Sequence, residues 1–256
     1  MRKMSDCFID LTITSPPYDN LRDYKGYSFD FENIANELYR ITKEGGVLIW
    51  IVGDATIKGS ETGSSFKQAL YFKRIGFNLH DTMIYRKTGT PFPSQARYNQ
   101  TFEYMFVLSK GNPKTFNPLM KRNITSGSFR KRATTRLKDG TKQIIHNRQT
   151  NEYGVEDNIW LIKNGSNKSS KDKAAFLHPA IFPEELAAKH IKSWSNKGEL
   201  IYDCFMGSGS TGKACALEGF NFVGIELDKD YCEIAKARID KAIEDKRIME
   251  SQMKLF

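Results

Sequence analysis

A proline turn near the start of the chain carries the first residues that could do chemistry. Residues 8–14 are rich in β-branched and aromatic side chains and predict a strand. The strand must end at Ser15, because Pro16 and Pro17 cannot continue a ladder. The prolines fix the backbone and lack N–H donors, so the turn presents free carbonyl acceptors beside the ring of Tyr18. Such a turn can bind an exocyclic amine while the tyrosine stacks on the base. Alone, it could equally end a strand or form a proline-tyrosine ligand for another protein.

A glycine loop near the end of the chain carries the second group. Residues 199–203 predict a short buried strand, which Gly207, Gly209 and Gly212 follow in the pattern G-x-G-x-x-G. The loop leads into a helical stretch at residues 213–217. Glycines let a backbone approach a ligand closely, and a helix N-terminus offers unpaired N–H groups.

An acidic residue completes this second pattern. Residues 221–225 predict another strand, which ends at Glu226. This offset from the glycines is close to the one at which an acid binds ribose hydroxyls in nucleotide-binding βαβ units. A glycine turn alone could serve strand-to-helix packing, but strand, loop, helix, strand and acid in register favour a cofactor site. With the proline turn, they indicate an enzyme that holds a flat base against a nucleotide-like cofactor.

These two motifs, in this order, resemble the amino-group DNA methyltransferases of the permuted "beta" arrangement. In that family the catalytic TSPPY (residues 14–18) comes first, a target-recognition segment follows, and the S-adenosylmethionine loop DCFMGSGS (residues 203–210) comes last. Three further stretches resemble family segments: residues 45–50, 102–110 and 178–183. The resemblance covers nearly the whole chain except its middle.

The resemblance implies the fold, the cofactor and the roles of particular residues. It implies a doubly wound, Rossmann-like α/β sheet of seven strands with an inserted recognition lobe, and S-adenosyl-L-methionine as cofactor. The boundaries that we expect are 1–117 and 176–256 for the catalytic and cofactor-binding halves, and 118–175 for the lobe. The implied catalytic residues are Ser15, Pro16, Pro17 and Tyr18. The implied cofactor-binding residues are Thr14, His178, Asp203, Phe205, Gly207, Ser208, Gly209, Ser210 and Glu226.

One family element has no counterpart in this sequence. Members usually carry a strand ending in Gly-Asp ahead of the catalytic strand, which helps to hold the cofactor adenine. Here only a short segment from Met1 precedes the strand at residues 8–14. We therefore expect either that this wall is missing or that the true start lies upstream.

Positive charge is concentrated in the middle of the chain. Residues 121–173 contain 13 Lys and Arg against 5 Asp and Glu, a net charge of +8, whereas the whole chain carries +9. Phosphate binding explains such a local surplus better than solubility does, although a solvated or disordered insertion is the alternative. The stretch shows little strand or helical periodicity before residues 158–162, and we expect a DNA-binding lobe that is partly flexible without DNA. The basic side chains expected to bind DNA are Arg130, Lys131, Arg132, Arg136, Lys138, Lys142 and Arg148.

The target atom can be narrowed from the residue types. Methylation of a cytosine ring carbon needs a covalent nucleophile, which related enzymes carry in a Pro-Cys pair, and no proline here precedes a cysteine. An exocyclic nitrogen is therefore the expected target, reached by direct transfer to a flipped base. Within the resembled family, a serine before the two prolines is associated mainly with N4 of cytosine, so Ser15 favours cytosine. The alternative is N6 of adenine.

Composition sets the remaining limits. The 256 residues, 39% of them hydrophobic, suffice for one α/β core with an appended lobe. No apolar run reaches the length of a membrane span, so we expect a cytoplasmic protein without membrane contact. Four cysteines without metal-ligand spacing predict buried thiols and no structural zinc: Cys7, Cys204, Cys215 and Cys232.

Other classes of function account for only part of the pattern. A nicotinamide dehydrogenase would show the glycines and Glu226, but it gives no reason for the proline turn or the basic stretch. Protein-glutamine methyltransferases usually carry Asn before the prolines and the two motifs in the opposite order, and an RNA methyltransferase shares both motifs. A DNA-binding module without activity would keep only the basic stretch. Double-stranded DNA is the expected partner, while a homodimer and a cognate restriction nuclease stay open.

Overall fold

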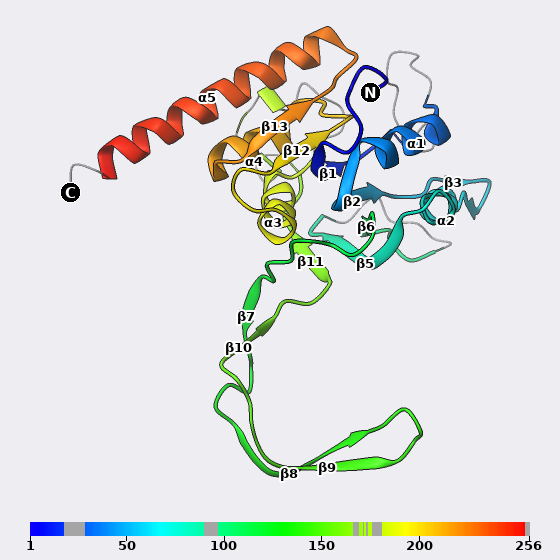
Figure 1. The fold of residues 1–256 in the computed structure, drawn as a ribbon, viewed down its shortest axis with the longest axis vertical. Coiled ribbons are helices and arrows are strands. Elements are labelled where there is room, and N and C mark those ends of the chain that lie inside the picture. Colours follow the sequence, from blue (N-terminus) through cyan, green and yellow to red (C-terminus); the bar gives the residue numbers. More distant parts are fainter. Residues whose placement is uncertain are drawn as a thin grey trace. The chain divides into compact units, whose positions relative to one another are not determined.

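A seven-stranded mixed sheet forms the centre of the larger of two units (Figure 1). The computed structural model describes residues 1–17, 29–89, 97–165, 169–170, 172, 174–175 and 181–253. Contacts divide the chain into one unit of Met1–Asn117 with Asn158–Phe256, and a second unit of Pro118–Asp157.

The sheet confirms the doubly wound α/β fold that the resemblance implied. Its strands lie in the order β11 (Ile159–Ile162), β5 (Asn78–Lys87), β6 (Phe102–Ser109), β2 (Thr42–Val52), β1 (Ile9–Thr14), β12 (Leu200–Asp203) and β13 (Asn221–Gly224). β6 runs antiparallel to both of its neighbours, whereas the other neighbouring pairs are parallel. The two strands that lead into the predicted motifs, β1 and β12, are hydrogen-bonded neighbours.

Helices cover both faces of the sheet. They are α1 (Phe31–Ile41), α2 (Ser64–Arg74), α3 (Glu184–Trp194), α4 (Ser210–Glu218) and α5 (Lys229–Met253). Leu38 of α1 and Phe72 of α2 share a buried cluster with Trp50 of β2. On the opposite face, Nε2 of His190 in α3 lies 3.3 Å from Sδ of Met105 in β6. The fold places His190 in the core. None of the described helices is both long and apolar enough to cross a membrane.

The second unit consists of antiparallel ribbons, where the sequence showed little strand periodicity. β7 (Met120–Arg122) pairs with β10 (Tyr153–Val155), and β8 (Phe129–Arg136) pairs with β9 (Lys142–Gln149). No residue from 118 to 157 is buried. Both faces of these strands are therefore exposed to solvent, so no alternation of apolar and polar residues identifies them in the sequence. The unit is shorter than the expected lobe, because β11 already belongs to the sheet. A further short hairpin, β3 (Thr56–Ile57) and β4 (Ser60–Glu61), lies in the larger unit.

The cysteine prediction was correct for only two of the four residues. Cys204 and Cys215 are buried free thiols, whereas Cys7 and Cys232 are exposed. Cys7 precedes β1 in a loop with a left-handed backbone, φ +50°, and Cys232 lies on the outer side of α5. The prediction was wrong for these two residues because a position in or beside a strand or helix does not by itself bury the side chain.

Candidate functional site

The two predicted motifs lie at a topological switch point of the sheet. β1 continues through α1 to β2 on one side, while β12 continues through α4 to β13 on the other (Figure 1). Because β1 and β12 are parallel neighbours, their carboxyl ends lie at the same edge. Ligands of open α/β sheets bind in the crevice outside such a point. The fold therefore brings the turn at residues 15–17 and the glycine loop to one binding edge.

A buried carboxylate joins the two motifs directly. The Thr14 hydroxyl donates to Oδ1 of Asp203 at 2.7 Å, across 189 residues of sequence, and the Thr211 hydroxyl of α4 donates to Oδ2 at 2.7 Å. The backbone N–H of Phe205 also donates to Oδ1, at 3.0 Å. Burial raises the pKa of the Asp203 carboxyl to about 6, although these three donors act in the opposite direction. One side chain thus connects the last residue of β1, the glycine loop and the first turn of α4.

Glu226 holds the other side of the loop. Its Oε2 accepts the N–H of Gly207 at 2.9 Å, and its Oε1 accepts the N–H groups of Leu227 and Asp228 at 2.8 and 3.0 Å. The side chain is half-buried. A carboxylate offers about four lone-pair positions, so these bonds leave acceptor capacity for a ligand hydroxyl. The acid therefore orders the glycine loop and keeps one side of its carboxylate available.

Glycine is required at each of the three motif positions, for different structural reasons. Gly207 and Gly209 have φ values of +49° and +80°, a backbone region that other residues rarely adopt. A Cβ at Gly209 would lie 2.8 Å from the Cβ of Ala235 in α5. A Cβ at Gly212 would lie 2.4 Å from Cδ1 of Ile239 and would also meet the side chain of Phe222. The second and third glycines therefore permit close packing of α4 against its neighbours.

Unpaired polar groups at the start of α4 suit the cofactor that the resemblance implies. Gly209 occupies the N-cap position, and no side chain caps the helix. The hydroxyl of Ser210 is buried and has no hydrogen-bond partner among the described residues. A helix N-terminus attracts anions, and a buried hydroxyl requires a partner. The methionine carboxylate and ribose hydroxyls of S-adenosyl-L-methionine provide groups of both kinds, so the residues present fit this molecule.

The remaining predicted site residues have separate outcomes. Ser15, Pro16 and Pro17 follow β1 directly, with Pro16 buried and the other two half-buried. Tyr18 and His178 lie outside the described residues.

Phe205 and Ser208 also lie in the glycine loop. The Phe205 ring packs edge-on against Phe29, with 5.7 Å between ring centroids, and the Ser208 side chain is buried. The Phe205 ring thus contributes to packing beside the loop, while its N–H belongs to the Asp203 junction.

The seven basic residues expected to bind DNA lie on one ribbon of the second unit. Arg130, Lys131, Arg132 and Arg136 belong to β8, Lys142 and Arg148 belong to β9, and Lys138 lies in the connecting turn. All seven are exposed. They form a cationic surface within a unit that has no buried residues.

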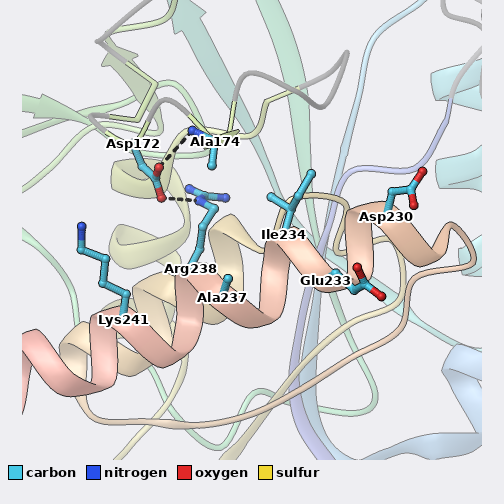
Figure 2. Close-up of a pocket in the computed structure, with 8 residues that line it drawn as sticks. All are labelled: Asp172, Ala174, Asp230, Glu233, Ile234, Ala237, Arg238 and Lys241. Carbon is cyan, nitrogen blue, oxygen red and sulfur yellow. Dashed lines mark hydrogen bonds and ion pairs between the residues drawn. The ribbon is translucent and has the colours of Figure 1, made fainter.

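Arg238 of α5 is a site residue that the sequence analysis missed. Its side chain is only 2% exposed, and its guanidinium donates to the backbone carbonyl of Ser208 in the glycine loop. It also donates to Oδ2 of Asp172 at 2.9 Å and to Oε1 of Glu184 at 2.7 Å (Figure 2 shows the Asp172 pair). Arg238 stands at helical spacing between the buried Ala235 and Ala242. A charge within an apolar helical face is the signal that could have identified it.

The Arg238 network extends beyond this one ion pair. Oε1 of Glu184 also accepts from Nζ of Lys213 at 3.1 Å and from the Ser170 hydroxyl at 2.6 Å. Burial acts to raise the pKa of Asp172, but the hydrogen bonds of Ala174 N–H and Arg238 outweigh it and lower that pKa. The hollow in Figure 2 contains none of the predicted cofactor residues. Arg238, which lines this hollow, supports the glycine loop through its hydrogen bond to the Ser208 carbonyl.

Comparisons with known proteins agree with this architecture. A family model described as DNA methylase matches residues 9–237. The chain is 57% identical over 244 residues to the orphan methyltransferase M.BamHII of Bacillus amyloliquefaciens, covering 94% of this chain and 92% of the relative. It is 25% identical over 281 residues to the type II methyltransferase M.MthZI of Methanothermobacter thermautotrophicus, covering 95% and 74%.

Two solved structures share the fold. The PvuII DNA methyltransferase, described as cytosine-N4-specific, has a TM-score of 0.65 at 18% identity and covers 95% of this chain and 86% of its own. The complex of M1.HpyAVI with S-adenosylmethionine has a TM-score of 0.59 at 21% identity, with coverages of 91% and 89%.

Ionisation of Asp203 should make stability depend on pH in a defined direction. Its folded pKa of about 6 exceeds the ~3.9 of a free Asp, so the folded state binds the proton more tightly. The contribution of this carboxyl to stability is therefore full below about pH 4 and falls as the pH rises to about 6. Urea unfolding measures the free energy of unfolding of the parent and of Asp203→Asn. From pH 4 to pH 7, the parent should lose on the order of 2 to 3 kcal/mol relative to the variant. Asp240→Asn, at an exposed position of α5, is the control, and a flat difference for Asp203→Asn would contradict the prediction.

Loss of Arg238 should be far more costly than loss of a surface arginine on the same helix. Arg238→Met leaves the partly buried Asp172 without its arginine partner, while Glu184 keeps Lys213. The loss should cost about 3 kcal/mol of unfolding free energy, the lower end of the range for a broken buried ion pair. Arg247 forms an exposed pair with Glu244 at 4.0 Å, and Arg247→Met should change stability by less than about 1 kcal/mol. Equal effects of the two variants in denaturant titrations would show that the network contributes nothing beyond a surface pair.

Proposed function

The chain belongs to the N6/N4 DNA methylase family, and on this premise we propose that it methylates N4 of cytosine in duplex DNA. The protein is a site-specific, S-adenosylmethionine-dependent DNA methyltransferase. The proposal concerns the target atom and the residues that serve it. The hydrogen bond from Thr14 to Asp203 supports the proposed roles of these residues most directly, because it ties the proline turn to the glycine loop at one edge of the sheet.

We propose that the backbone carbonyls of Ser15 and Pro16 orient the target amine. The amine lone pair is conjugated with the base, so hydrogen bonds from its protons to fixed carbonyls favour a geometry in which it can attack. When bound, S-adenosyl-L-methionine supplies an electrophilic methyl group. The protein's contribution is positioning and electrostatics, because attack by the amine needs no covalent enzyme intermediate. Tyr18 is proposed to stack on the base after it leaves the duplex.

The choice of cytosine N4 rests on residue types. Ser15 stands where the resembled cytosine enzymes carry serine, and the PvuII enzyme of the same fold is described as cytosine-N4-specific. Both amines lie on a similar edge of their base, so N6 of adenine is the second candidate. The relatives include an orphan methyltransferase and type II methyltransferases, so a cognate restriction nuclease stays open. A homodimer stays open as well.

We propose that the second unit, residues 118–157, contacts the DNA. It carries the predicted basic residues on an exposed ribbon, and phosphate contacts position a protein on DNA without reading its sequence.

Nucleosides from methylated DNA identify the target atom. Mass spectrometry of plasmid DNA treated with the enzyme and S-adenosyl-L-methionine should detect N4-methylcytosine. N6-methyladenine alone would overturn the assignment to cytosine but leave the methyltransferase activity intact. Tyr18→Ala is the matched variant: it should lose most of the transfer while binding S-adenosylhomocysteine like the parent.

Glu226 should control cofactor affinity. Glu226→Ala removes a charge-assisted acceptor and releases the Gly207 N–H, at a cost of about 1.5 to 3 kcal/mol in binding, or roughly 10- to 150-fold in Kd. Calorimetry with S-adenosylhomocysteine measures this, and Glu233→Ala on the exposed side of α5 is the control. Parent-like affinity of a folded Glu226→Ala variant would contradict the assigned role.

A further inference from the structure

The ribbon of β8 and β9 has two chemically different faces. Directly opposed residues of an antiparallel pair lie on the same face, and faces alternate along each strand. The register pairs Arg130 with Arg148 and Arg136 with Lys142. Arg132 pairs with His146 on the same face. The basic run at residues 129–132 is therefore divided, because Lys131 points to the other side.

Charge is distributed very unevenly between these faces. β8 and β9 contain six Lys and Arg and no Asp or Glu. Five of the six share one face, which we call the cationic face: Arg130, Arg132, Arg136, Lys142 and Arg148. Alternation along β8 places Lys131 on the opposite face. The paired residues of that face are all neutral: Phe129, Ala133, Thr135, Gln143, Ile145 and Gln149.

The cationic face is unfavourable for the protein alone. Like charges placed directly opposite each other on a two-stranded ribbon destabilise it, and Arg130 with Arg148 and Arg136 with Lys142 are two such pairs. An isolated two-stranded ribbon is marginal in water, and no residue of this unit is buried to compensate. A polyanion lying along this face would remove the repulsion. A merely solvated surface would gain nothing from placing five cations on one side.

We propose that the cationic face of β8 and β9 lies against the DNA and that the face containing Lys131 is turned away from it. The inference rests on the proposed DNA contact of this unit and adds which side of the ribbon makes it. A two-stranded ribbon fits the major groove, which is about 12 Å wide. Arginine, four of the five cations, binds phosphate and the guanine edge through two parallel hydrogen bonds.

Single-charge variants along one strand test the sidedness. Arg130→Gln, Arg132→Gln and Lys131→Gln each remove one positive charge from three consecutive exposed residues. Fluorescence anisotropy measures the slope of log binding constant against log salt concentration for a duplex. The magnitude of this slope should fall by about 0.9 for each single arginine variant, as for one lost phosphate contact, and by about 1.8 for the double variant Arg130→Gln/Arg132→Gln. Lys131 is not expected to contact the DNA. Lys131→Gln should therefore lower the slope by less than half of the effect of a single arginine variant. A changed preference for DNA sequence in an arginine variant would also place its face on the DNA, at base edges.

The outcomes separate this inference from the proposed function. Equal slopes for the arginine and Lys131 variants would refute the sidedness, and so would a larger effect of Lys131→Gln. Parent-like slopes in all variants, with methyl transfer retained, would remove the ribbon from the DNA path while leaving the enzyme's activity as proposed. Absence of methyl transfer to any duplex by the parent would instead overturn the proposed function itself.

Discussion

The site depends on a carboxylate that the protein keeps out of water. Asp203 stands at the end of β12 and accepts hydrogen bonds from the neighbouring strand end, the loop that follows it, and α4. Desolvation disfavours its charge, and these donors reduce that cost, so each of the three segments has a reason to stay in place. Thr14 cannot move without affecting the glycine loop, and the proline turn begins one residue later. The proline turn and the glycine loop are therefore held together by the hydrogen bond of Thr14 to Asp203 as well as by the pairing of β1 with β12.

Much of the larger unit could be predicted because its signals are local. Buried strands next to prolines and glycines identify where each loop leaves the sheet, and the family order of the two motifs placed them together. Arg238 could not be found in this way, since its partners Asp172 and Glu184 lie far along the sequence and only the packed fold brings them together. The strands of the second unit could not be predicted for another reason. They have no buried face, so their sequence lacks the alternation by which strands are recognised.

The two units use opposite physical means for their tasks. The larger one obtains its geometry from a dry core, buried ion pairs and close helix packing at Gly209 and Gly212. The smaller one has backbone pairing and surface charge without a core, which suits a surface that adapts to a charged ligand. A change of a surface charge in the smaller unit should thus leave the core of the larger unit undisturbed, because no residue of the smaller unit is buried.

The order of strands along the chain has a consequence for biosynthesis. β1 is made early, yet its neighbour β12 in the middle of the sheet is made nearly 190 residues later. During translation one side of β1 can pair with β2, while its other side carries unpaired N–H and C=O groups until the last third of the chain emerges. Such non-local pairing slows folding and exposes an apolar strand edge to other nascent chains. The unpaired edge of β1 is therefore a place at which aggregation can begin before β12 is available.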